Sequence, residues 1–81
     1  MTVRTLLFAS YRDIAGIDEI EIELPTNATC ADLVQQLRDA GGRWNTLPPM
    51  PVVAVNLEYV PLDTILRNGD EVALIPPVAG G

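Results

Sequence analysis

Residues 68–81 read NGDEVALIPPVAGG, and this stretch decides the fold. Asn68-Gly69-Asp70 is a strong turn signal, because Asn and Gly tolerate the positive φ angles that tight turns need. The run that follows, 71–75, is apolar after its first residue and predicts the last strand. Two prolines come next and cannot continue a strand. The chain therefore ends in a strand up to Ile75 and an extended tail over 76–81.

Three further runs predict strands. Residues 3–9 lack Gly and Pro and place apolar side chains on both faces, which is typical of a central strand. Residues 19–24 alternate between Glu and an apolar residue, so the acidic side chains face water and the apolar ones face the core. Residues 52–56 are nearly all apolar, and after a turn at 56–58 the chain resumes a short strand at 59–60.

One long helix is predicted over 30–40. Thr29 is a favourable N-cap, and Asp32 in the first turn favours the helix dipole. Glycines at 41–42 end the helix. The apolar stripe of this helix contains Cys30, Leu33, Val34 and Leu37. Because Cys30 lies on that stripe, we expect it to be a buried small hydrophobic residue rather than a reactive thiol.

Two segments outside these elements carry weaker signals. A short helical turn is predicted over 11–15, with a capping box from Ser10 to Asp13 and with Gly16 at its end. The proline-rich residues 43–51 predict a surface loop, in which we expect Trp44 to cover the core.

The order strand, strand, helix, strand, strand predicts an α+β fold of the β-grasp, ubiquitin-like type. One main helix packs on one face of a small mixed sheet. The first and last strands are apolar on both faces, so we place them together at the centre. A single β-grasp domain over 1–75 would then carry a flexible C-terminal Gly-Gly tail over 76–81.

The composition excludes several classes of function. The 81 residues carry five Arg and eleven acidic residues, a net charge of −6, with no His, no Lys and one Cys. This acidic balance argues against binding to nucleic acid or to an anionic membrane surface. The chain lacks the commonest general base, and one Cys forms neither an internal disulfide nor a Cys/His metal site. No targeting or membrane-spanning segment is visible, so we expect a cytoplasmic protein without a metal site.

The tail is the remaining candidate for chemistry. Pro76 and Pro77 favour an extended backbone, while Gly80 and Gly81 carry no Cβ and can pass through a narrow channel. A terminal carboxylate is a poor electrophile, so its reaction requires activation, typically as an anhydride made with ATP. A frayed terminus is the alternative interpretation. The proline-stiffened exit from a β-grasp domain favours a functional tail, because a pre-organised peptide binds at lower entropic cost.

The same residues resemble a known family. The segments 68–73 and 75–81 are similar to the sulfur-carrier β-grasp proteins, and most of all to the small subunits of molybdopterin synthase. The resemblance extends over essentially the whole chain. Its other matching residues are Phe8-Ala9 with Arg12 and Gly16, and Ala54-Val55-Asn56.

The resemblance implies a cycle in which an activating enzyme uses ATP to adenylate Gly81, and a sulfur-donor protein then supplies the sulfur of a C-terminal thiocarboxylate. The thiocarboxylate donates its sulfur to a cyclic pyranopterin monophosphate and so forms the dithiolene of molybdopterin. The active-site side chains would belong to a large subunit, in an assembly of two small and two large subunits, and this chain would bind no cofactor. The tail residues implied to enter the large subunit are Pro77, Val78, Ala79 and Gly80. The residues implied to meet its surface are Phe8, Arg12, Ile75 and Pro76.

Alternatives remain open from the sequence. The chain could carry sulfur for thiamine, cysteine or tRNA thiolation, or it could be a ubiquitin-like modifier that forms isopeptide bonds through Gly81. A plain interaction module with an inert tail is a further alternative. Strand alternation requires that one of Leu74 and Ile75 faces inward, and it does not say which.

Overall fold

The structure is a computed structural model that describes residues 1–41 and 51–76. The predicted position of Trp44, nearly all of the predicted loop and the tail beyond Pro76 lie outside these described residues. The described helices are too short and too polar to cross a bilayer.

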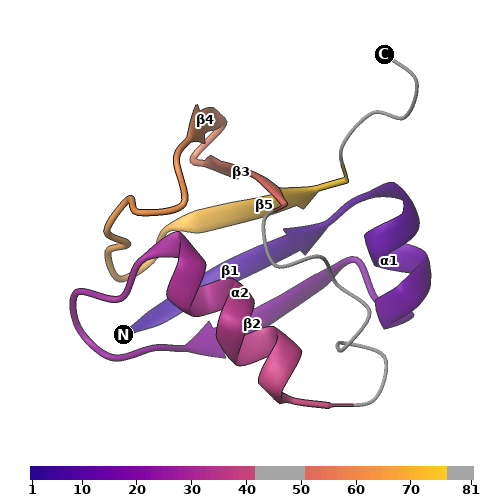
Figure 1. The fold of residues 1–81 in the computed structure, drawn as a ribbon, viewed down its shortest axis with the longest axis horizontal. Helices are drawn as coiled ribbons and strands as arrows, with labels where there is room; N and C mark the ends of the chain where they lie inside the picture. The colour runs from indigo at the N-terminus through magenta and orange to yellow at the C-terminus, as the bar shows by residue number, and fades with distance from the viewer. Residues whose placement is uncertain (42–50, 77–81) are drawn as a thin grey trace.

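Five strands form one mixed sheet (Figure 1). They are β1 (Thr2–Leu7), β2 (Glu19–Glu23), β3 (Val52–Val55), β4 (Glu58–Val60) and β5 (Glu71–Ile75). Their order across the sheet is β2-β1-β5-β3-β4, with β1 and β5 parallel and the other neighbours antiparallel. The first and last strands therefore pair at the centre, as predicted, and the fold is the expected β-grasp.

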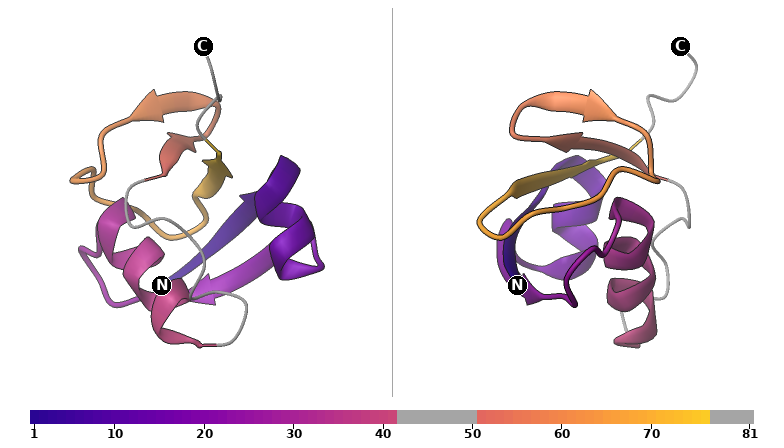
Figure 2. Two further views of the ribbon diagram at one scale, coloured as in Figure 1. Left: turned by 45° about the vertical axis from the view of Figure 1, so that its right-hand side comes forward. Right: turned by 90° about the vertical axis from the view of Figure 1, so that its left-hand side faces the viewer.

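Helix α2 (Cys30–Asp39) lies across one face of this sheet (Figure 2). The Thr29 hydroxyl accepts a hydrogen bond from the Asp32 amide at 3.2 Å, and the Asp32 carboxylate accepts one from the Thr29 amide at 2.9 Å. This reciprocal capping box holds the start of the helix where the sequence predicts it. The predicted apolar stripe is buried against the sheet, and the core beneath it includes Val3, Leu7, Val53, Val72 and Leu74.

Helix α1 (Ala9–Ala15) begins earlier than predicted. Phe8 is its N-cap and Ser10 lies inside the helix, so the predicted capping box is wrong. The chain reverses directly after β1 because Ala9 takes a positive φ of 49°, which brings the Tyr11 amide 3.0 Å from the Phe8 carbonyl oxygen. The predicted end at Gly16 is confirmed, with φ 75° and its amide donating to the Arg12 carbonyl oxygen at 2.8 Å.

A two-residue turn joins β3 to β4. Asn56 and Leu57 have φ angles of 50° and 73°, the mirror-image turn that suits the twist of a hairpin. The Asn56 side chain donates to the Asp70 carboxylate at 3.0 Å and accepts from the Glu71 amide at 3.1 Å. The hairpin is thereby tied to the start of β5, and it turns the side chains of its tip toward the face of the sheet opposite α2.

Candidate functional site

The face of the sheet opposite α2, which we call the open face, is left uncovered by the described helices (Figure 2). The core side of each strand is filled by buried residues, so the alternate residues point to the open face. β2, at one edge, contributes a row of exposed glutamates, and the strands between the edges contribute mostly apolar side chains. These open-face residues are Thr2, Arg4, Leu6, Glu19, Glu21, Glu23, Val52, Ala54, Tyr59, Glu71, Ala73 and Ile75.

The structure shows which of the last two residues of β5, Leu74 or Ile75, faces the core. Leu74 is fully buried in the core, so Ile75 lies on the open face and is partly exposed. Pro76 follows at the rim of that face. Ile75 therefore places an apolar side chain on the open face directly before the first proline of the tail.

Phe8 and Ile75, two of the predicted partner-binding residues, come together at one hollow of about 200 Å³. Phe8 is 46% exposed although it is aromatic, because it lies just beyond the end of β1 rather than within the strand as predicted. The residues that line the hollow are Leu6, Phe8, Ala54, Leu57, Tyr59, Glu71, Ala73 and Ile75. An apolar depression at the root of the tail is the kind of surface that binds another protein.

Arg12 lies on the other side of Phe8. Its side chain is exposed on α1 and lines a neighbouring hollow that also includes Phe8, Asp18 and Glu19. Among residues 1–41 and 51–76 it makes no ion pair, so its guanidinium is available to a partner.

Two exposed residues of the β3–β4 hairpin are missing from the predicted partner-binding residues. Leu57 is 91% exposed and Tyr59 is 75% exposed, and both line the hollow. The signal in the sequence is the pair Asn56-Leu57, since a bulky apolar residue is rarely placed where a tight turn requires a positive φ. Such a residue costs stability at an exposed position, which suggests that its side chain is needed for contact.

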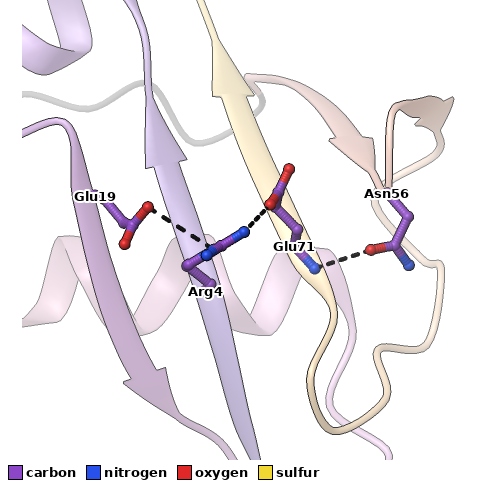
Figure 3. A network of polar contacts seen from close by, with 4 residues as sticks. All are labelled: Arg4, Glu19, Asn56 and Glu71. Atoms are coloured by element: carbon purple, nitrogen blue, oxygen red, sulfur yellow. Dashed lines mark hydrogen bonds and ion pairs between the residues drawn. The ribbon is translucent and has the colours of Figure 1, made fainter.

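An ion-pair network lies on the open face, and its member Glu71 also lines the hollow (Figure 3 shows the network). The Arg4 guanidinium donates to the Glu71 carboxylate and lies 3.8 Å from Glu19, and these partners raise the pKa of Arg4. Arg4 is the one basic residue on the open face among the described residues, against the three glutamates of β2 and Glu71. The face is therefore acidic beside its apolar hollow and favours a basic partner surface.

Cys30 is placed away from any reactive surface. Its side chain is fully buried beneath the start of α2, as predicted, and burial raises the pKa of the thiol to about 11. No group of three or more potential metal ligands occurs within the described ranges. The surface feature that the described residues offer is the apolar hollow beside Ile75.

The predicted reactive end, Gly81, and the insertion residues 77–80 lie outside the described residues. Five residues follow Pro76, and in extended form they would span at most about 17 Å. That length lets a carboxyl group reach into a partner that covers the open face.

Comparisons with known proteins give the chain a family. A model of the ThiS family matches residues 5–81. The chain is 41% identical over 83 residues to a molybdopterin synthase sulfur carrier subunit of Chlamydomonas reinhardtii, covering 100% of both chains. A putative molybdopterin converting factor subunit 1 from Pyrococcus furiosus is 33% identical, with a TM-score of 0.80 over 96% of this chain and 99% of that one. SAMP1 from Haloferax volcanii, a small archaeal modifier protein, is 28% identical with a TM-score of 0.83 over 100% of both chains.

Proposed function

The chain belongs to the ThiS family, and we propose that it works as the sulfur carrier subunit of a molybdopterin synthase. The observation that carries this proposal is the full-length similarity to such subunits, at 41% identity over the whole of both chains. The structure supports it with an apolar, acid-flanked face that includes Ile75, the residue directly before the tail.

The reactive group is the C-terminal carboxylate of Gly81. An activating enzyme joins this carboxylate to the α-phosphate of ATP and releases pyrophosphate. A sulfide equivalent from a sulfur-donor protein then displaces AMP, so that one carboxyl oxygen leaves with the AMP and sulfur takes its place. The product is a thiocarboxylate, a soft anionic nucleophile that needs no side chain of this chain to activate it.

The domain acts as a handle that delivers this sulfur. The large subunit covers the open face around Phe8 and Ile75, takes up residues 77–80 and brings the thiocarboxylate to a cyclic pyranopterin monophosphate. The thiocarboxylate sulfur displaces an oxygen substituent of the pyranopterin side chain, so that a C–S bond forms as a C–O bond breaks. Water then cleaves the acyl–sulfur bond, which leaves the sulfur on the substrate and restores the carboxylate of Gly81. A second charged carrier supplies the other sulfur of the dithiolene.

Mass spectrometry of the intact protein tests the first half of this cycle. Incubation with the activating enzyme, ATP and a sulfur donor should add the mass difference between sulfur and oxygen at Gly81. The chain lacking Gly81 is the matched control and should stay unchanged. An unchanged wild-type mass would exclude a sulfur carrier of any pathway.

Reconstitution tests the second half. Thiocarboxylated protein, the large subunit and the pyranopterin precursor should form the dithiolene product. If the thiocarboxylate forms but no dithiolene appears, the molybdopterin assignment is wrong and a carrier for thiamine, cysteine or tRNA thiolation replaces it.

A ubiquitin-like modifier is the second candidate, favoured by the likeness to SAMP1. The chain contains no Lys, so it could not build Lys-linked chains of itself. Isopeptide conjugates of Gly81 on lysines of other proteins, found by peptide mass spectrometry, would establish this activity.

A further inference from the structure

The hollow on the open face is produced by the register of four strands. Leu6 of β1 is paired with Ala73 of β5, Ala73 with Ala54 of β3, and Ala54 with Tyr59 of β4. Two small residues thus lie side by side between two large ones. Their methyl groups form the floor of a depression whose walls are Leu6 and Tyr59.

The neighbouring rows close the two ends of this depression. On the side of the tail lie Ile75, which is paired with Val52, and Phe8. On the other side lies Glu71, held by Arg4. Apart from Glu71, the side chains of the lining residues offer only carbon and one tyrosine hydroxyl.

The two alanines are unfavourable for the fold alone. Ala is depleted in strands, where β-branched and aromatic residues pack better on a pleated surface. Neighbouring positions of β3 and β5 on the core side carry Val53, Val72 and Leu74. Small residues on the open face therefore keep space free that a larger side chain would fill.

The residues around the hollow indicate what kind of partner surface can fill it. A partner that takes up the tail has to cover Ile75, because Pro76 follows it directly, and Ile75 is itself a wall of the hollow. Beyond Leu6 the partner meets the β2 row, where Leu6 is paired with Glu19 and Arg4 with Glu21. Contact with this row favours Lys or Arg.

We propose that the hollow over Ala54 and Ala73 receives one large apolar side chain of the large subunit, presented from a surface whose basic residues face the β2 glutamates. This inference rests on the proposed function and makes Ala73 a residue that determines partner specificity. The contact is of the kind in which one anchor residue fills a desolvated pocket within a larger interface.

Ala73→Leu tests the inference by filling the hollow from its floor. The matched control is Ala31→Leu, the same change at an exposed position of α2 away from the open face. Isothermal titration of each carrier with the isolated large subunit should show at least about tenfold weaker binding for Ala73→Leu, since an excluded apolar anchor forfeits its burial. Ala31→Leu should bind like the wild type.

Thermal unfolding accompanies each titration. If Ala73→Leu does not fold, Ala73→Val replaces it, because Val suits a central strand and still reduces the hollow. Unchanged affinity of a folded, filled variant would overturn the inference and leave the proposed function standing. Failure of the wild type itself to bind the large subunit would instead overturn the molybdopterin assignment, and the inference with it.

The salt dependence of binding to the large subunit tests the proposed basic partner surface. Binding of the wild type should weaken as NaCl is raised, and Glu21→Gln should reduce that dependence. A wild-type affinity that does not change with salt would overturn the basic partner surface.

Discussion

Replacing Leu57 by glycine should make the domain more stable and its complex with the large subunit weaker. Leu57 has a φ of 73° in the β3–β4 turn, and its side chain is 91% exposed. The substitution therefore relieves backbone strain and removes almost no buried area. The same side chain lines the hollow on the open face, where a partner would cover it.

The two effects can be given magnitudes. A non-glycine residue in the left-handed region costs roughly 1–2 kcal/mol, and glycine gives back about 0.5–1 kcal/mol through the freedom of the unfolded chain. The expected gain in the free energy of unfolding is then about 0.5–1 kcal/mol, a rise in Tm of about 2–8 °C for a domain of this size. Burial of a leucine is worth about 1.5–3 kcal/mol, so affinity should fall about 10- to 150-fold.

Thermal denaturation measures the first effect and isothermal titration with the large subunit the second. Leu57→Asn is the matched control, because Asn tolerates a positive φ but supplies no apolar contact. It should lose affinity like the glycine variant. A glycine variant less stable than the wild type would show that Leu57 is not left-handed in solution. Unchanged affinity in both variants would place the hairpin tip outside the interface.

Further predictions concern the tail, the core and the helix cap. Deletion of Gly81 should abolish thiocarboxylate formation without lowering Tm; a lower Tm would count against a free tail. Thr5→Val should stabilise the protein by about 1–3 kcal/mol in chemical denaturation, because the fully buried Thr5 hydroxyl has no hydrogen-bond partner within the described ranges. Thr29→Ala should destabilise it by about 1 kcal/mol through loss of the cap of α2, measured in the same way. Burial raises the pKa of the Cys30 thiol from 9.0 to about 11. The stabilisation of the fold that comes from keeping this thiol neutral is therefore fully present below pH 9 and is lost as the pH rises through 11. Urea titrations should show the wild type losing stability relative to Cys30→Ala over that pH interval.

Much of the fold is predictable because its signals are local. The alternation at 19–24 predicts a strand and its buried face, and the Thr29 cap predicts the start of a helix. Neither prediction needs information from the rest of the chain. The start of α1 is not predictable in this way. The Ser10–Asp13 pattern has the form of a capping box, but the helix begins earlier, at Ala9, whose positive φ accompanies the reversal of the chain after β1.

Some residues of the candidate site are also predictable from the sequence, and others are not. Phe8 and Ile75 are identified from the family resemblance, and the structure brings them to one hollow. The choice between Leu74 and Ile75 requires knowledge of which face α2 covers. Leu57 and Tyr59 become visible only when the β3–β4 register is known, because pairing across the sheet rather than spacing along the chain brings them beside Phe8.

The parallel pairing of β1 with β5 has a consequence for how the protein is made. The sheet has the last strand of the chain between β1 and β3, so the first 70 residues lack the element that joins the two halves. Such long-range pairing delays folding until late in synthesis. A chain released early would expose unpaired strand edges and be open to degradation. Any folded molecule has therefore been translated at least to Ile75, within six residues of Gly81, the residue proposed to carry the sulfur.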